Sequence, residues 1–101
     1  KLSILNMNPV EEFEKITEEL YSYVINRDNG LCQICGKVGE HVHHVEYRSH
    51  QGKNCGRNLI TLCMNCHTGK FGIHGCNDKT IVTILKEKIL RNERQLKEKL
   101  K

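Results

Sequence analysis

The sequence predicts an α+β fold in which a small metal-held core is flanked by an N-terminal and a C-terminal helix. All six cysteines and all six histidines lie within residues 32–76, and apolar residues recur at helical spacing on both sides of that segment. So short a core buries too little surface to fold by burial alone, so a bound metal or disulfides are expected. We therefore expect three parts: a helical N-terminal arm at residues 1–30, a core at residues 31–76 and a basic C-terminal helix at residues 77–101.

The N-terminal arm is expected to form one amphipathic helix that begins at Val10, after the turn signal of Asn8-Pro9, and ends between Asn26 and Gly30. Glutamates follow directly after Val10, where negative charge favours a helix start. Its apolar residues recur at steps of three and four: Phe13, Ile16, Leu20 and Tyr23 or Val24. We expect this face to pack on the core.

The core is expected to contain two strands followed by a short helix. Valine, tyrosine and an alternating pattern predict a strand from His41 to Tyr47, and the composition of residues 48–58 predicts a loop. A second strand is expected at Leu59–Leu62. The short helix then begins at the second cysteine pair, and Gly69 limits its length.

The C-terminal segment is expected to form a second long helix, capped by Asn77 or Asp78. A narrow apolar stripe runs along it, formed by Ile81, Leu85, Ile89, Leu96 and Leu100. Asn92 interrupts this stripe, which favours a solvated helix over a coiled-coil arm. Residues 86–101 carry seven basic and three acidic side chains, so the helix is either an arm that follows phosphates or a linker helix.

The net charge of +4 is unevenly distributed along the chain. Residues 1–31 carry three basic and six acidic side chains, whereas residues 32–76 carry five basic and two acidic ones. The core and the C-terminal helix are therefore the basic parts of the molecule. This distribution suits a polyanionic partner such as nucleic acid.

Two Cys-x-x-Cys pairs, Cys32 with Cys35 and Cys63 with Cys66, predict a structural zinc site. Two such turns bring four thiolates to one ion, and a site closed by four protein ligands leaves no position for substrate. The pairs are 27 residues apart, more than in a plain zinc ribbon, and the insert holds histidines. Two disulfides are the alternative, which the lack of a visible secretory signal disfavours.

Several spaced elements together resemble the HNH endonuclease family. They are Asn26–Gly36 with the first cysteine pair, Val42-His43-His44-Val45, Gly52, Asn58–Cys63 and Cys66-His67, which cover roughly residues 27–74. The resemblance implies a ββα-metal fold in which the two cysteine pairs hold zinc around a catalytic hairpin. The family often has proline a few residues after the second histidine, and this chain has Tyr47-Arg48-Ser49 there, a difference that concerns the loop and not the metal site.

The resemblance also implies a role for each polar residue of the motif. His43 and His67 occupy the positions that hold a catalytic divalent cation such as magnesium, manganese, nickel or zinc. His44 occupies the position of the general base, and Asn58 the position that braces the loop and helps to orient the base.

This assignment agrees with the chemistry of phosphodiester hydrolysis. A neutral imidazole can accept a proton from water near neutral pH. Two protein ligands leave positions on a metal open for phosphate and water. However, adjacent strand residues face opposite sides, so His43 and His44 converge only if the strand ends or bulges there. Simple alternation would instead place His41 beside His43.

Other residues carry weaker predictions. Four basic side chains around the expected site are candidate phosphate contacts: Arg48, Lys53, Arg57 and Lys70. His50 and His74 are expected to be surface histidines. Cys55 and Cys76 lie outside the two pairs and are expected to be free thiols.

We therefore expect an intracellular, metal-dependent DNA endonuclease that does not enter the membrane, with DNA as its partner and a larger parent protein or complex as a further candidate partner. The alternative is a non-catalytic zinc module that binds nucleic acid or protein. The simultaneous presence of His43, His44, Asn58 and His67 favours the enzyme, since a binding module does not need all four. A redox switch that uses Cys55 or Cys76 has little support.

Overall fold

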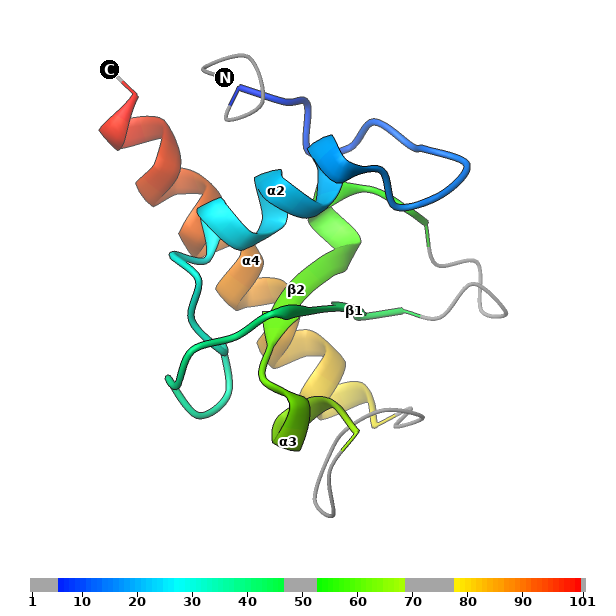
Figure 1. The fold of residues 1–101 in the computed structure, drawn as a ribbon, viewed down its shortest axis with the longest axis vertical. Coiled ribbons are helices and arrows are strands. Elements are labelled where there is room, and N and C mark those ends of the chain that lie inside the picture. The colour runs from blue at the N-terminus through cyan, green and yellow to red at the C-terminus, as the bar shows by residue number, and fades with distance from the viewer. Residues whose placement is uncertain (1–5, 47–52, 69–77, 101) are drawn as a thin grey trace.

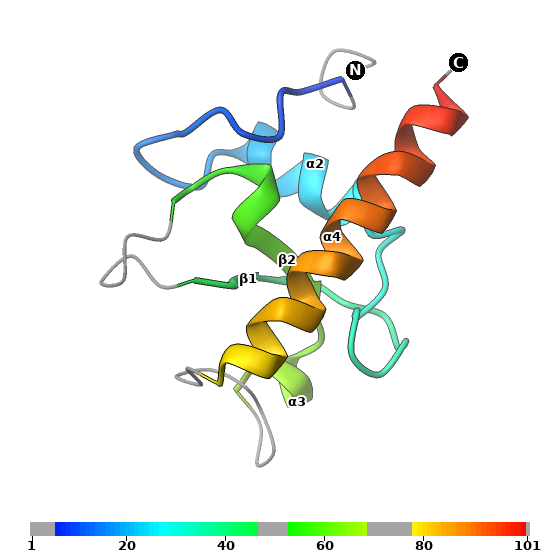
Figure 2. The same cartoon turned by 180° about the vertical axis from the view of Figure 1, so that it is seen from behind.

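The computed structural model describes residues 6–46, 53–68 and 78–100, and it confirms the α+β class. Two short antiparallel strands, β1 (His41–His44) and β2 (Leu59–Leu62), form a sheet in the middle of the molecule. Helix α2 (Glu18–Arg27) lies on one side of this sheet and the long helix α4 (Lys79–Lys99) on the other (Figures 1 and 2). The short helix α3 (Met64–His67) follows directly after β2.

The register of the sheet assigns a face to each side chain. His41 pairs with Leu62 and His43 with Ile60, while Val42 pairs with Thr61 and His44 with Leu59. Directly paired residues of antiparallel strands share a face. Both strands were predicted from the sequence, and β2 has the predicted bounds.

Strand β2 contributes to two hydrophobic clusters because it is buried on both faces. Ile60 and Leu62 pack with Leu85 and Ile89 of α4. Leu59 packs on the other face with Leu20, Tyr23 and Val24 of α2 and with Leu96 near the end of α4. Each fully buried leucine or isoleucine contributes roughly 1.5–3 kcal/mol, so this four-residue strand is central to the stability of the fold.

Helix α2 begins at Glu18, so the prediction of a helix from Val10 is wrong. Thr17 caps the helix, and its side chain accepts a hydrogen bond from the backbone N–H of Leu20. The residues before it bond to a distant loop: Phe13 N–H donates to the Asn54 carbonyl, and Arg57 N–H donates to the Pro9 carbonyl. The predicted packing of Leu20, Tyr23 and Val24 on the core is confirmed.

Helix α4 begins after Asp78, whose side chain accepts hydrogen bonds from the backbone of Thr80 and Ile81. The expected apolar stripe is not a solvated feature, because Leu85, Ile89 and Leu96 are buried against the sheet and α2. Asn92 is buried as well. The helix is therefore an integral part of the fold.

A buried polar network joins both helices to β2. The Arg27 guanidinium pairs with the Asp28 carboxylate at 2.8 Å, and both side chains are completely inaccessible to solvent. Arg27 also donates to the carbonyls of Gly56 and Leu59, while Asp28 accepts from the Thr61 N–H and from the side chain of Asn92. The charges are therefore satisfied by atoms of α2, of the short 3-10 helix Gly56–Asn58, of β2 and of α4.

Helices α2 and α4 pack with the sheet in the hydrophobic clusters. The predicted division of the chain at residues 30/31 and 76/77 stays a prediction. Within the described ranges, no helix has the length and apolar character needed to cross a membrane.

Candidate active site and metal centre

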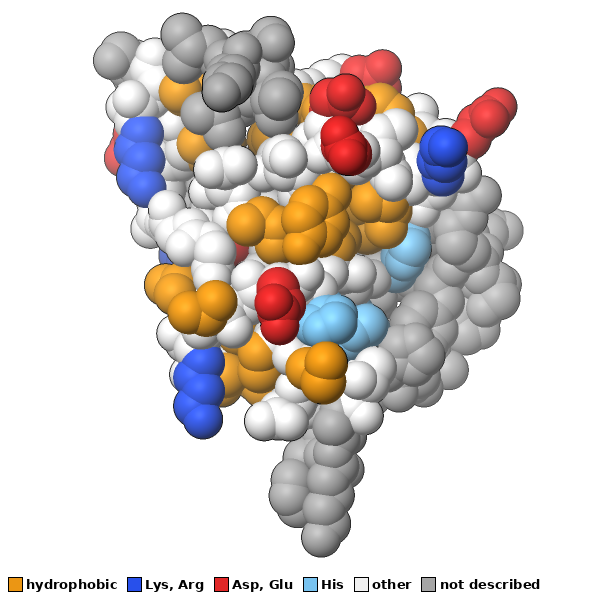
Figure 3. Space-filling view, viewed as in Figure 1, with side chains coloured by type: hydrophobic (Ala, Val, Ile, Leu, Met, Phe, Trp, Pro, Cys, Tyr) orange, Lys and Arg blue, Asp and Glu red, His pale blue; other side chains and the backbone are white. Residues whose placement is uncertain are grey.

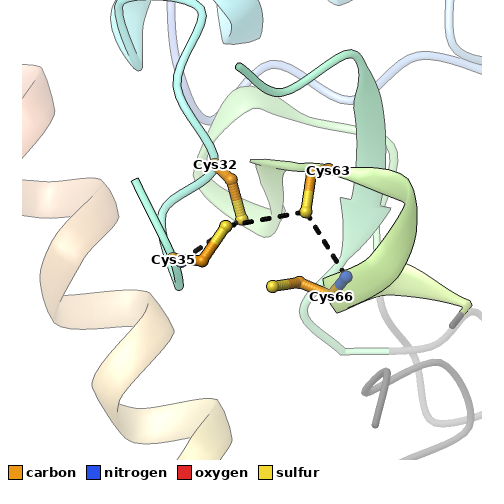
Figure 4. A group of neighbouring side chains, drawn as sticks. All are labelled: Cys32, Cys35, Cys63 and Cys66. Atoms are coloured by element: carbon orange, nitrogen blue, oxygen red, sulfur yellow. Dashed lines mark hydrogen bonds between the residues drawn. The ribbon is translucent and has the colours of Figure 1, made fainter. Parts of the chain in front are cut away.

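The four cysteines of the two pairs converge on one point. Cys32 and Cys35 lie on the turn after α2, while Cys63 caps α3 and Cys66 lies within it (Figure 4). Their sulfur atoms all lie within 4.8 Å of one another, and the Cys35 and Cys63 sulfurs are 3.6 Å apart. That separation is well beyond a disulfide bond of about 2.05 Å. The four side chains are therefore positioned to hold a metal ion.

The local backbone explains how each pair is shaped. The N–H of Cys35 points at the Cys32 sulfur and the N–H of Cys66 at the Cys63 sulfur, each at 3.5 Å. Gly36 has φ +82°, a conformation that side chains disfavour, which lets the chain turn back directly after Cys35. Gly39 passes so close to Cys32 that an added Cβ would lie 2.9 Å from the Cys32 backbone nitrogen.

The same backbone groups act on the acidity of the thiols. Burial acts to raise the pKa of Cys32, but hydrogen bonds from the backbone of Cys35 and Cys63 outweigh it and lower that pKa to about 6. Burial and the neighbouring cysteines raise the pKa of Cys66 to about 12. Backbone donors that stabilise a thiolate favour the form that binds metal.

Histidines from β1 and α3 form a second cluster. The rings of His43 and His67 lie edge to face with centroids 5.0 Å apart, and the ring of His41 lies 5.6 Å from that of His67. His43 is buried, whereas His41 and His67 are half-buried. The rings of His43 and His67 are close enough to reach one ion. Figure 3 shows that histidine side chains reach the surface in two places on the face seen in Figure 1, beside an apolar patch.

His44 occupies the opposite face of β1. Its Nε2 lies 2.7 Å from Oδ1 of Asn54, and its strand partner is Leu59. His43 and His44 therefore have different immediate partners, as strand alternation requires, and β1 ends at His44. Alternation also places His41 on the face of His43, beside His67.

Asn58 ties together the two ends of the loop between the strands. Its Oδ1 accepts from the Glu46 N–H, and its Nδ2 donates to the carbonyls of Glu46 and Lys53. All three bonds hold backbone atoms of the loop, and the Asn58 side chain is buried. The bracing geometry expected at this position is thus present, while the direct contact to His44 comes from Asn54.

Two of the four predicted phosphate contacts lie among the described residues. Lys53 is exposed, and Arg57 forms an ion pair with Glu93 of α4 at 2.9 Å. Both line a pocket of about 340 Å³ beside Asn58 and the buried free thiol of Cys55. Predictions for five other residues fall outside the described residues: Arg48, His50, Lys70, His74 and Cys76.

Sequence reasoning missed one residue at these sites, Asn54. Asn54 lies in a segment rich in glycine, asparagine and basic residues, where composition predicts only a loop. His41 was considered from strict alternation as an alternative partner of His43, and the structure places its ring 5.6 Å from that of His67.

Comparison with known proteins agrees with the motif. Residues 32–71 match the family model described as HNH endonuclease. The matched segment spans 40 of the 101 residues. It contains both cysteine pairs, the histidines of β1 and His67 of α3. The family is of the nuclease type.

One relative gives a further, shorter match. The mitochondrial DNA mismatch repair protein mutS homolog of Sarcophyton glaucum is 38% identical over 42 residues. The aligned part covers 36% of this chain and 4% of the relative, so the similarity concerns a small portion of that protein. No solved structure is significantly similar to the chain.

Proposed function

We propose that the chain is a metal-dependent HNH endonuclease that hydrolyses phosphodiester bonds in DNA. The observation that carries the proposal is the pairing of His43 and His67, with centroids 5.0 Å apart, inside the segment that matches the HNH family model. An imidazole from a strand and another from a short helix lie side by side, and neutral imidazole is a common metal ligand. Such a pair suits metal binding.

Each residue of the site has a distinct part in the proposal. His43 and His67 would hold one divalent cation, such as magnesium, manganese, nickel or zinc. This ion would supply Lewis-acid stabilisation for the phosphate and the leaving oxygen. His44 acts as the general base that takes a proton from water, while Asn58 keeps the loop between the strands in shape.

The four cysteines serve stability in this proposal. They hold a structural zinc ion, which suits four sulfur ligands gathered in one place. An intracellular location is part of the proposal, because thiols stay reduced there. Lys53 and Arg57 are the described candidates for phosphate contacts, and DNA is the proposed partner.

Cleavage of supercoiled plasmid with added magnesium, manganese or nickel tests the proposal. The zinc-loaded chain should cut the plasmid, and His44→Ala should cut it roughly 10²–10⁴-fold more slowly while still binding DNA and metal. His43→Ala and His67→Ala should instead weaken binding of the added metal, as titration calorimetry would measure. Equal cleavage by His44→Ala and the unchanged protein would refute the assignment of the base. No cleavage with any metal would leave a non-catalytic binding module.

A further inference from the structure

We propose that Asn54 is a positioning residue that holds His44 with its proton on Nε2, so that Nδ1 is the nitrogen left to accept a proton. The inference rests on the proposed nuclease function and names a residue that the HNH motif does not supply. It follows from one short contact, the 2.7 Å between His44 Nε2 and Asn54 Oδ1.

The orientation of the Asn54 amide follows from its second partner. Nδ2 of Asn54 lies 3.0 Å from the backbone carbonyl oxygen of Glu14. A carbonyl oxygen only accepts hydrogen bonds, so the nitrogen of the amide must face Glu14 and the oxygen must face His44. An amide oxygen also only accepts, so Nε2 of His44 must carry the proton.

The backbone holds Asn54 in place for this task. Its carbonyl accepts the N–H of Phe13 at 2.9 Å, and the residue is 6% exposed. The segment at Phe13 and Glu14, where a helix was expected, thus binds both ends of Asn54. An acceptor fixed in this way loses little rotamer freedom when it bonds the imidazole.

The consequence for His44 is a choice between its two neutral tautomers. A neutral imidazole has one N–H and one lone-pair nitrogen, and the bond at one nitrogen decides which is which. With the proton on Nε2, the lone pair is on Nδ1, and only that atom can take a proton from water. The other tautomer would place two lone pairs against each other at Asn54 and present an N–H at Nδ1, where a base needs a lone pair.

Nitrogen NMR of the zinc-loaded chain tests the inference without any need for cleavage. Long-range proton–nitrogen spectra distinguish the tautomers of each histidine, and His44→Gln identifies the signals of His44. Under conditions where the ring is neutral, we expect the Nε2–H form of His44 in the unchanged protein. Asn54→Leu, which removes the acceptor at similar size, should give a mixture of tautomers. Asn54→Asp, which keeps an oxygen there but cannot donate to Glu14, should retain the Nε2–H form.

Kinetics provide the second readout. Asn54→Leu should lower kcat for plasmid cleavage by about 10- to 100-fold, as is typical when a partner that orients a functional imidazole is removed, with KM nearly unchanged. Asn54→Asp should recover most of that loss. Asn26→Leu, the same change at an exposed position of α2, should alter neither the tautomer nor kcat. Zinc content and the thermal midpoint would show that each variant is folded.

The outcomes separate the two proposals. An Nδ1–H form of His44 in the unchanged protein, or the same tautomer in Asn54→Leu, would overturn the inference even if the chain cuts DNA. Equal kcat in Asn54→Leu and the unchanged protein would overturn it as well. The expected tautomers in a chain that cuts nothing would support the role of Asn54 in positioning and refute the nuclease function.

Discussion

At the scale of single residues, the stability of this chain depends on one buried pair of charges. Asp28 accepts hydrogen bonds from Arg27, Thr61 and Asn92, so one carboxylate joins the end of α2, the strand β2 and the middle of α4. Helices packed only through apolar contacts could slide by one turn at modest cost. Directional bonds to Asp28 select one arrangement.

Asp28→Ala should therefore lower the free energy of unfolding by roughly 3–5 kcal/mol, because it leaves the Arg27 guanidinium buried without its counter-charge. Urea denaturation of the zinc-loaded protein would measure the change. Glu19→Ala, an acidic-to-alanine change at an exposed position of α2, should stay within about 0.5 kcal/mol of the unchanged protein. Equal midpoints for the two variants would mean that the pair does not anchor α2.

Local sequence could predict the four-cysteine group but not this anchor. Spacing alone identifies Cys32, Cys35, Cys63 and Cys66, because each pair lies within one turn of the chain. Asp28 and Asn92 are 64 residues apart, and nothing local indicates that they meet. In the sequence Asn92 interrupts an apolar stripe, and its hydrogen bonds to Asp28 and Gln33 explain why a polar side chain is buried there.

At the scale of elements, segments set by local signals were predicted correctly, whereas the helix start that depends on distant contacts was predicted wrongly. Strand β2 and the start of α4 were predicted because apolar, β-branched residues and an aspartate cap act within a few residues. The prediction of a helix from Val10 was wrong because the sequence offers two acidic helix starts. One is formed by the glutamates after Val10, and the other, which the structure uses, by Thr17 with Glu18 and Glu19. Backbone bonds of residues 9, 13 and 14 to the loop at residues 54–57 exclude the earlier start.

The group of four cysteines, Cys32, Cys35, Cys63 and Cys66, is the feature whose loss should have the largest effect on the fold. Cys66→Ser removes one of the four sulfurs of the proposed zinc site, and a structural zinc site contributes its binding energy directly to folding. We expect this variant to hold less than one zinc per chain and to lose cooperative thermal unfolding. Elemental analysis and circular dichroism would measure both.

Cys55→Ser is the matched control for that experiment. Cys55 is buried like Cys32 but lies outside the four-sulfur group. The control should keep one zinc per chain and a cooperative transition, with only modest destabilisation. A Cys66→Ser protein with full zinc content and an unchanged midpoint would contradict a structural role for the site.

At the scale of the whole molecule, α4 combines a packed apolar face with an exposed basic surface. One side of the helix completes both hydrophobic clusters. Arg91, Arg94 and Lys97 remain exposed on the rest of its surface. Removing residues 91–101 would also remove Asn92, Glu93 and Leu96, which are buried, so a deletion cannot separate DNA binding from folding.

Neutralising the exposed charges is the sharper test of whether α4 follows DNA phosphates. Replacing Arg91, Arg94 and Lys97 together by glutamine should weaken DNA binding. Each phosphate contact that is lost should reduce the slope of log affinity against log salt by about 1. Zinc content, unfolding midpoint and kcat should stay the same, because none of the three side chains is buried. Lys15→Gln, an exposed lysine outside the helix, serves as the control. If the triple variant binds with the slope of the control, the helix does not touch phosphate, and its cations serve only to keep that surface hydrated.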